Sequence, residues 1–375
     1  MNDWTHQLLS RRAFLGNAAV AATGLAGAIA WQRRGPQLEG VLLSAFEDGR
    51  GDQYVGGVTL ETETVFGARV PMRAHGCAID PLDPQRTLFF ARRPGTQAYE
   101  FRRDSLHVRT VFSTPAGRHL SGHGVFSPRG DLLYVPEHDY EHVRGVVSVR
   151  DARTFAILHE IDTHGIDPHE IAWHPDGRTL FVANGGILTH PRTFRRKLNI
   201  ATMDPSLCAI DARSGECREQ WRLPHHQLSI RHLAVTGDGN VIAGLQYEGA
   251  GAAPGIIAVH RPNGALQLLD LPPQVTAQFK GYVASVAVSE PRDLLAAACP
   301  YGGGVACWSL ADASYRGFVT GAEAYGLSRL ADGSLLASQR DGTALRVEET
   351  RLRSQFLRFT SATPIRWDDH WVATT

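Results

Sequence analysis

The sequence has no excess of charge of either sign. It contains 38 basic and 38 acidic residues among 375, whereas a protein that binds a polyanion carries a basic surface, so we expect no nucleic-acid partner. At 43% hydrophobic residues the chain is rich enough in apolar side chains to bury a large core. These values are typical of a globular protein, which we expect to be a monomer.

Long uninterrupted hydrophobic runs are also missing. The longest apolar stretch, residues 13–30, contains three glycines and a threonine, which make it a weak membrane span. It follows Arg11 and Arg12 and ends in an A-x-A cleavage site, a pattern that resembles a twin-arginine export signal, although an uncleaved anchor is the alternative. We therefore expect a signal peptide over residues 1–30 and one periplasmic domain over residues 31–375, not an integral membrane protein.

Cysteine is scarce, with five residues in the chain. Cys208 and Cys217 flank one predicted hairpin turn, and Cys299 and Cys307 flank another. Direct cross-strand disulfides are strained, so the sequence leaves open whether either pair is bonded. Cys77 has no partner and is predicted to be a buried thiol.

The motifs of familiar enzymes are absent as well. The sequence has no G-x-S-x-G nucleophile elbow, no C-x-x-C-H haem attachment and no H-E-x-x-H metalloprotease helix. Gly302, Gly303 and Gly304 lie in a predicted hairpin with no helix after it to hold a phosphate. Hydrolase, c-type haem and nucleotide-binding functions are therefore not supported by any motif.

A repeated unit is what the sequence does contain. Each copy is an apolar strand, a turn rich in Pro, Asp and Gly, and a second apolar strand, and copies recur about every 40 to 60 residues. Another pair of short strands follows each copy, and segments of helical period are almost absent, which predicts a β-propeller with four-stranded blades. A β-sandwich is the alternative, but it does not predict a repeat. The copies begin at or near His75, His123, His169 and His232, and two weaker copies carry Ser285 and Tyr325 at the histidine position.

The number of blades follows from the ends of the chain. Six full units are present, and three further strands, at residues 41–46, 54–60 and 65–70, precede them. The missing inner strand of this first blade can come from residues 369–373 at the C-terminus, which removes the free sheet edges. The predicted fold is therefore all-β, a seven-bladed propeller whose first blade is closed by the C-terminal strand.

This topology predicts a cluster of histidines. The inner strands of all blades begin at one mouth of the channel, so the five histidines at that position should converge there beside Glu170: His75, His123, His169, His232 and His370. Neutral imidazole is the commonest transition-metal ligand, so we predict a site for iron or copper, the alternative being hydrogen bonds between blades. An unperturbed histidine titrates near ~6.5, which predicts tighter binding at about pH 7.5 than at about pH 5.5. Further candidates predicted on the same face are Arg73, Arg92, Arg93, Arg118, Glu137, Asn184, Arg231 and Glu248.

Several blocks of the sequence resemble a known family. They read GRHLSGHGVFSPRGDLLYVPEHDY, HGIDPHEIAWHPDGRTLFVANGGILTHP, KLNIATMDPSL, HQLSIRHLAV and QYEG. They resemble a bacterial family of twin-arginine-exported propellers that is classified as a domain of unknown function. The resemblance implies a periplasmic role in iron acquisition, with imelysin-type and dihaem-peroxidase-like proteins as partners. The chain departs from the family pattern at Glu137, His138 and Asp139, where Asn is typical, and at Leu188, where Glu is typical.

Three functions remain open at this point. The first is a periplasmic accessory protein that binds a metal, or a metal-loaded partner, at the histidines. The second is a metal-dependent oxidoreductase with Glu170 as acid or base, by analogy with the seven-bladed propeller of nitrous oxide reductase, which holds copper on inner-strand histidines. The third is an interaction scaffold without a metal.

Overall fold

The structure is a computed structural model that describes residues 38–194, 196–348 and 353–374. The predicted signal peptide over residues 1–30 lies outside these ranges. Residues 40–375 form one compact unit. Within the described part of the chain, no helix is long and apolar enough to cross a membrane.

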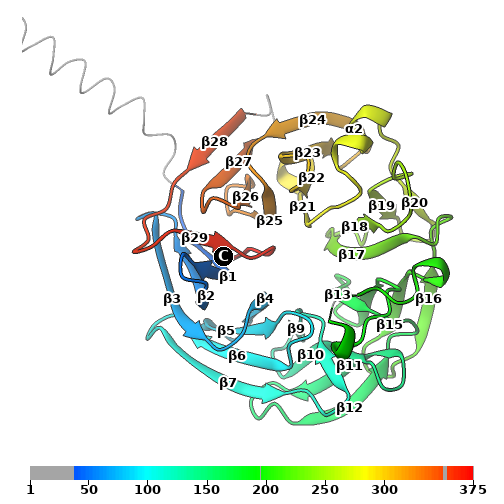
Figure 1. Ribbon diagram of the computed structural model, residues 1–375, viewed down its shortest axis with the longest axis horizontal. Helices are drawn as coiled ribbons and strands as arrows, with labels where there is room; N and C mark the ends of the chain where they lie inside the picture. The colour runs from blue at the N-terminus through cyan, green and yellow to red at the C-terminus, as the bar shows by residue number, and fades with distance from the viewer. Residues whose placement is uncertain (1–37, 195, 349–352, 375) are drawn as a thin grey trace, which may run out of the picture. The chain divides into compact units, whose positions relative to one another are not determined.

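Seven antiparallel sheets are arranged around a common centre, which confirms the predicted seven-bladed propeller (Figure 1). Blade 1 consists of β29 (Ile365–Trp367) and β30 (Val372–Thr374), followed outward by β1 (Val41–Asp48), β2 (Gln53–Thr59) and β3 (Thr64–Val70). Blade 2 consists of β4 (Ala74–Asp80), β5 (Asp83–Ala91), β6 (Gln97–Arg102) and β7 (His107–Ser113). Blade 3 consists of β8 (Arg118–Leu120) and β9 (Val125–Phe126), then β10 (Leu132–Asp139), β11 (Arg144–Asp151) and β12 (Ile157–Asp162).

The other four blades are regular four-stranded sheets. Blade 4 consists of β13 (Pro168–Trp173), β14 (Thr179–Asn184), β15 (Ser206–Asp211) and β16 (Cys217–Trp221). Blade 5 consists of β17 (Leu228–Val235), β18 (Val241–Tyr247), β19 (Ile257–His260) and β20 (Leu266–Leu268). Blade 6 consists of β21 (Ser285–Ser289), β22 (Leu294–Cys299), β23 (Gly304–Ser309) and β24 (Tyr315–Thr320). Blade 7 consists of β25 (Ala324–Arg329), β26 (Leu335–Gln339), β27 (Ala344–Glu348) and β28 (Arg353–Leu357).

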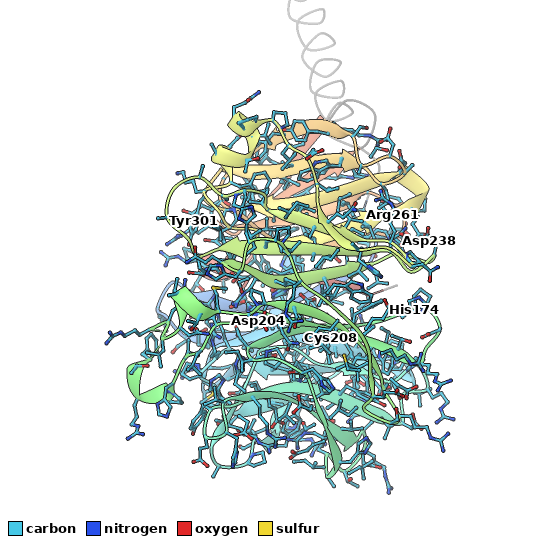
Figure 2. The ribbon with its side chains drawn as sticks, turned by 90° about the vertical axis from the view of Figure 1, so that its right-hand side faces the viewer. His174, Asp204, Cys208, Asp238, Arg261 and Tyr301 are labelled. Atoms are coloured by element: carbon cyan, nitrogen blue, oxygen red, sulfur yellow. The ribbon has the colours of Figure 1, made fainter. Side chains whose placement is uncertain are left out.

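Among the residues that the structure describes, helical structure is confined to short turns in the connections. They are η1 (Pro191–Thr193) and η2 (Ile200–Thr202) between β14 and β15, α2 (Pro273–Gln278) before β21, and η3 (Glu290–Arg292) between β21 and β22. The first two lie in the long connection within blade 4. In the side view of Figure 2, Tyr301 and Asp204 lie toward one face of the propeller, and His174, Asp238 and Arg261 lie toward the other.

The C-terminus closes blade 1, as predicted, but with two strands instead of one. Trp367 in β29 lies opposite Phe46, and Val372 in β30 lies opposite Leu43. Between them, residues 368–371 stand opposite only two residues of β1, so they leave the sheet as a bulge. His370 therefore lies in this break and does not begin a strand.

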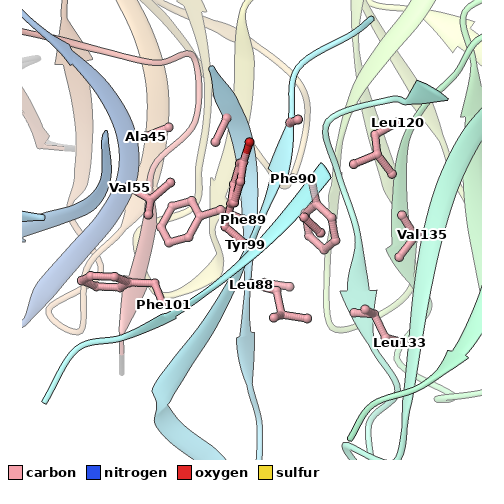
Figure 3. Close-up of a cluster of buried hydrophobic side chains, with 14 of the residues drawn as sticks. Ala45, Val55, Leu88, Phe89, Phe90, Tyr99, Phe101, Leu120, Leu133 and Val135 are labelled. Carbon is pink, nitrogen blue, oxygen red and sulfur yellow. The ribbon is translucent and has the colours of Figure 1, made fainter. Parts of the chain in front are cut away.

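The core is made between blades, because each sheet packs both of its faces against neighbours. In β5, successive side chains alternate in direction: Phe89 points toward Val55 of blade 1, whereas Leu88 and Phe90 point toward Leu133 and its neighbours in blade 3 (Figure 3). All three β5 side chains are fully buried. Burial of one such side chain contributes about 1.5–3 kcal/mol, so this packing holds the inner strands in a defined position.

All five cysteines are free thiols. Cys208 lies opposite Gln220, not Cys217. Cys307 lies opposite Ala296, not Cys299, so the two cysteines of each pair do not face each other across neighbouring strands. The sequence predicts a buried thiol at Cys77, but in the structure this residue is only half-buried.

Candidate metal centre

Irregularities in the inner strands present the histidines to the centre. In β4, Ala74 lies opposite Ala91 and Cys77 lies opposite Phe89, so the two residues between, including His75, face a single residue of β5. Such a β-bulge bends the strand and redirects the side chain at the bulge.

The other four blades that carry a histidine of the cluster have similar irregularities in their inner strands. In β13 the register shifts at His169, and in β17 it shifts at Arg231, next to His232. In blade 3 the break between β8 and β9 contains His123, and the break between β29 and β30 contains His370. The histidines thus share one structural position that departs from the regular strand.

Two glycines allow histidines of neighbouring blades to approach each other. The amide of Gly76 donates a hydrogen bond to the carbonyl of Gly122 at 2.8 Å, which joins blades 2 and 3. A Cβ added at Gly76 would lie 2.9 Å from Nδ1 of His123, and one at Gly122, where φ is +107°, would lie 2.8 Å from Cδ2 of His75. Side chains at either position would therefore push the two imidazoles apart.

The five imidazoles form one cluster, as predicted. The ring centroid of His370 lies 4.5 Å from that of His75, 4.6 Å from that of His123 and 4.9 Å from that of His232. The centroid of His169 lies 4.9 Å from that of His232 and 5.3 Å from that of His123. The rings meet mostly edge to face, so their nitrogen atoms can converge on a shared space.

Three sets of side chains in this cluster have the arrangement of metal ligands. In each set, one potential ligand atom per residue lies within 4.8 Å of the others. The sets are His75, His123 and His169; His123, His232 and His370; and His75, Asp368 and Asp369. Nitrogen and carboxylate ligands of this kind suit iron, copper and zinc.

Burial keeps the imidazoles neutral. Desolvation holds the pKa of His75, His123 and His169 well below the ordinary value, and it lowers the pKa of His232 to about 3 and that of His370 to about 4. Neutral imidazole offers a lone pair to a metal. The buried Nε2 atoms of His123 and His370 have no hydrogen-bond partner within the described part of the protein.

Two carboxylates orient histidines of the cluster. Nδ1 of His75 lies 2.5 Å from Oδ1 of Asp368, and Nδ1 of His232 lies 3.1 Å from Oε2 of Glu170. Burial acts to raise the pKa of Asp368, but the adjacent His75 and arginines hold it well below the ordinary value, so this carboxylate accepts the proton of Nδ1. Desolvation raises the pKa of Glu170 to about 7.

A polar pocket of about 520 Å³ adjoins the cluster. Its walls contain Arg73, Arg92, Arg93 and Arg231 together with three of the histidines. Asp167 is fully buried between two of these arginines, at 2.6 Å from Arg93 and 2.8 Å from Arg231. The long connection in blade 4 also reaches this pocket through Lys197.

Four of the other predicted residues do not line the pocket. Arg118 pairs with Glu160 at 2.6 Å, Glu137 pairs with Arg150 at 3.0 Å, and the amide of Asn184 donates to the carbonyl of Thr163 at 2.7 Å. These three residues support blades 3 and 4 internally. Glu248 pairs with Lys197, which does line the pocket.

Sequence reasoning missed three aspartates and a tyrosine. Asp368 and Asp369 directly precede His370, and Asp167 lies two positions before His169, so proximity to repeat histidines was an available signal. Tyr282 lines the pocket from the connection before β21, which lies outside the repeat pattern. No sequence signal could have selected it.

The fold and the cluster together define a seven-bladed propeller with a buried histidine centre. The chain belongs to the family described as "Protein of unknown function (DUF1513)", which it matches over residues 68–374. No curated protein matches the sequence. Among solved structures, the crystal structure of the Mitotic Checkpoint Complex contains a chain with a TM-score of 0.56 and 14% identity, with 78% of each chain covered. This likeness concerns the fold alone, and a fold hosts many functions.

Proposed function

We propose that the protein binds a transition-metal ion, iron or copper, on its clustered histidines and serves as an accessory protein of periplasmic metal acquisition. The observation that carries the proposal is the set of five imidazoles, held neutral and directed at one another. Among the described residues, the buried Nε2 atoms of His123 and His370 have no hydrogen-bond partner. A buried polar atom left unpaired costs about 1–3 kcal/mol. A metal ligated by these atoms offsets that cost.

The alternative of interblade hydrogen bonds accounts for the cluster less well. If the histidines served only to join blades, each buried ring nitrogen should have a hydrogen-bond partner, either a protein group or an ordered water. The unpaired atoms of His123 and His370 therefore also weigh against a metal-free scaffold.

One observation favours an oxidoreductase as the second candidate. Glu170 has a pKa raised by desolvation to about 7 and contacts His232, so it is suited to exchange a proton beside a metal at neutral pH. The accessory role stands first because the resemblance to exported propellers implies iron acquisition and no reaction.

The cellular context is part of the same proposal and is supported by the sequence. Export through the twin-arginine pathway moves folded proteins, so a metal can be inserted before transport. Imelysin-type and dihaem-peroxidase-like iron-uptake proteins are the partners that the resemblance implies. The protein would act as a monomer.

The test is the metal content of the purified protein and of a double variant. We expect elemental analysis to find iron or copper bound to the native protein, and His123→Ala with His169→Ala to abolish this binding. The matched control is His107→Ala with His159→Ala, because both of these histidines are exposed on outer strands. Circular dichroism should show the same fold for both variants. Metal retained by the cluster variant, or a native protein that binds none of iron, copper, cobalt and zinc, would contradict the proposal.

A further inference from the structure

The five imidazoles carry no negative charge, which a buried metal ion requires. Neutral imidazoles donate electron pairs but do not compensate the charge of a divalent or trivalent cation. A buried charge without compensation is costly, because a protein interior solvates it poorly. The groups around the cluster must therefore supply anions, or the metal must bring one.

The pocket above the cluster is already positively charged. Arg73, Arg92, Arg93 and Arg231 line it, and their carboxylate partners are Asp167, Asp368 and Asp369. Four guanidinium groups thus share three carboxylates, because Asp167 pairs with both Arg93 and Arg231. Asp368 also accepts a hydrogen bond from His75. The other basic side chains of the wall have acids of their own: Lys197 pairs with Glu248, Arg340 pairs with Glu323, and Arg366 lies 4.0 Å from Glu47.

Donors for an anion remain available in this wall. The side chain of Arg231 is only 8% exposed. Its buried Nε has no hydrogen-bond partner within the described residues. Arg92 is 18% exposed and uses Nη2 for Asp369 at 3.0 Å, while its Nη1 is 4.0 Å from Asp368, beyond a good hydrogen bond. Tyr282 adds a hydroxyl, whose pKa burial raises well above its ordinary value, so it remains a donor.

The volume of the pocket points to an organic anion. At about 520 Å³ it is far larger than a hydrated site for one ion and lies in the range of about 300–1,000 Å³ that small-molecule sites occupy. Guanidinium groups bind carboxylates through two parallel hydrogen bonds, which also fixes orientation.

We propose that the pocket receives the metal as an anionic chelate: a small polycarboxylate is held by Arg92, Arg231 and Tyr282 while the histidines ligate the same metal ion. This inference rests on the proposed metal site and names the chemical class of its cargo. The carboxylates supply the charge that the imidazoles lack, and the arginines recognise them. A bare cation has no comparable interaction with this wall.

The test compares Co(II) binding with and without a chelating dicarboxylate. Co(II) is titrated into the metal-free protein alone, with oxalate, and with sulfate at equal ionic strength, and the Kd is corrected for complexes formed in solution. We expect oxalate to tighten Co(II) binding roughly tenfold, a usual size for coupling between two ligands, and sulfate to have no such effect. Arg92→Gln and Tyr282→Phe should each reduce the gain from oxalate. Arg118→Gln is the matched control, because Arg118 pairs with Glu160 outside the pocket, and it should keep the gain.

Each outcome decides between the two proposals. Co(II) binding that oxalate does not tighten, or that sulfate tightens equally, overturns the chelate and leaves the metal site standing. Absence of Co(II) binding with and without oxalate overturns the chelate, and it overturns the metal site as well if iron, copper and zinc also fail to bind. If Arg92→Gln fails to fold because Asp369 loses its closest ion pair, Tyr282→Phe still tests the inference, because no described residue is hydrogen-bonded to the Tyr282 hydroxyl.

Discussion

Nδ1 of His75 donates a hydrogen bond to Oδ1 of Asp368 at 2.5 Å, across 293 positions of the chain. The two residues belong to different blades: His75 lies in the bulge of β4, and Asp368 lies in the break between β29 and β30. Because Asp368 is ionised, the proton is on Nδ1, and the lone pair of Nε2 is directed away from the carboxylate. A carboxylate in this position orients a histidine and makes it a stronger metal ligand.

Asp368 is therefore expected to position His75 for metal binding. Replacing Asp368 by Asn removes the charge while keeping the shape, and it should weaken metal affinity about 10- to 100-fold, the usual effect of losing such a partner. Isothermal titration with Co(II) measures this change. The control is Asp104→Asn, because Asp104 is exposed and pairs with Arg102 away from the cluster. An unaltered Kd in Asp368→Asn would show that this carboxylate does not position His75 for the metal and contributes only to closure of the ring of blades.

The buried histidines should make stability depend on pH. Their pKa values in the unfolded chain are near ~6.5, and in the folded protein desolvation lowers them, to about 3 for His232 and about 4 for His370. Between these pKa values the unfolded chain binds more protons than the folded protein. The free energy of unfolding therefore falls as the pH falls below about 6.5, and above that pH these groups do not change it. Desolvation raises the pKa of Glu170 to about 7, so this residue changes the free energy of unfolding with pH in the opposite direction. It is a single group, however, whereas the cluster contains five histidines.

Urea denaturation between about pH 4.5 and 6.5 measures this dependence. His123→Gln removes one such group and should reduce the slope by about 1.4 kcal/mol per pH unit, whereas His107→Gln on an outer strand should leave it unchanged. An equal slope in all three proteins would mean that the cluster does not titrate on unfolding. An unperturbed histidine would lose metal affinity between about pH 7.5 and about pH 5.5. Because the histidines of the cluster have lowered pKa values, we expect their loss of metal affinity at a lower pH than this interval.

Closure of blade 1 should contribute strongly to stability. Truncation after Asp369 removes β30 and its pairing with Leu42 and Leu43, and it also removes Trp371, which is 4% exposed and packs 5.3 Å from the ring of Trp367. Loss of a buried tryptophan alone costs about 3–5 kcal/mol, so thermal unfolding should show a much lower Tm. Trp371→Ala, which keeps the strand, separates packing from pairing. A Tm equal to that of the full chain would rule out a stabilising role for the shared blade.

The export signal makes a separate prediction. Replacing Arg11 and Arg12 by Lys should leave folded protein in the cytoplasm, because the export machinery recognises the arginine pair. The chain offers a matched control in Arg33 and Arg34, a second arginine pair beyond the predicted signal peptide. Cell fractionation should find the control variant in the periplasm. Periplasmic accumulation of the first variant would mean that residues 1–30 are not a twin-arginine signal.

The repeat, together with closure of the ring by the C-terminal strand, was enough to predict the fold and five members of the cluster. Blade number, strand order and closure by the C-terminus follow from alternating apolar residues and regularly spaced turns, because each blade is a local unit with its own pattern. His75, His123, His169 and His232 could be assigned to one mouth because they hold equivalent places in successive units.

The tertiary structure alone decided how these side chains are used. The bulges at His75 and His169, and the breaks that contain His123 and His370, depend on pairing with other strands, which local sequence does not specify. Asp368 reaches His75 only when the ring closes, since 293 residues separate them. Repeat position determines which residues arrive at the mouth, but desolvation and charge pairing between blades determine which of them are neutral, which are paired and which are free to bind a ligand.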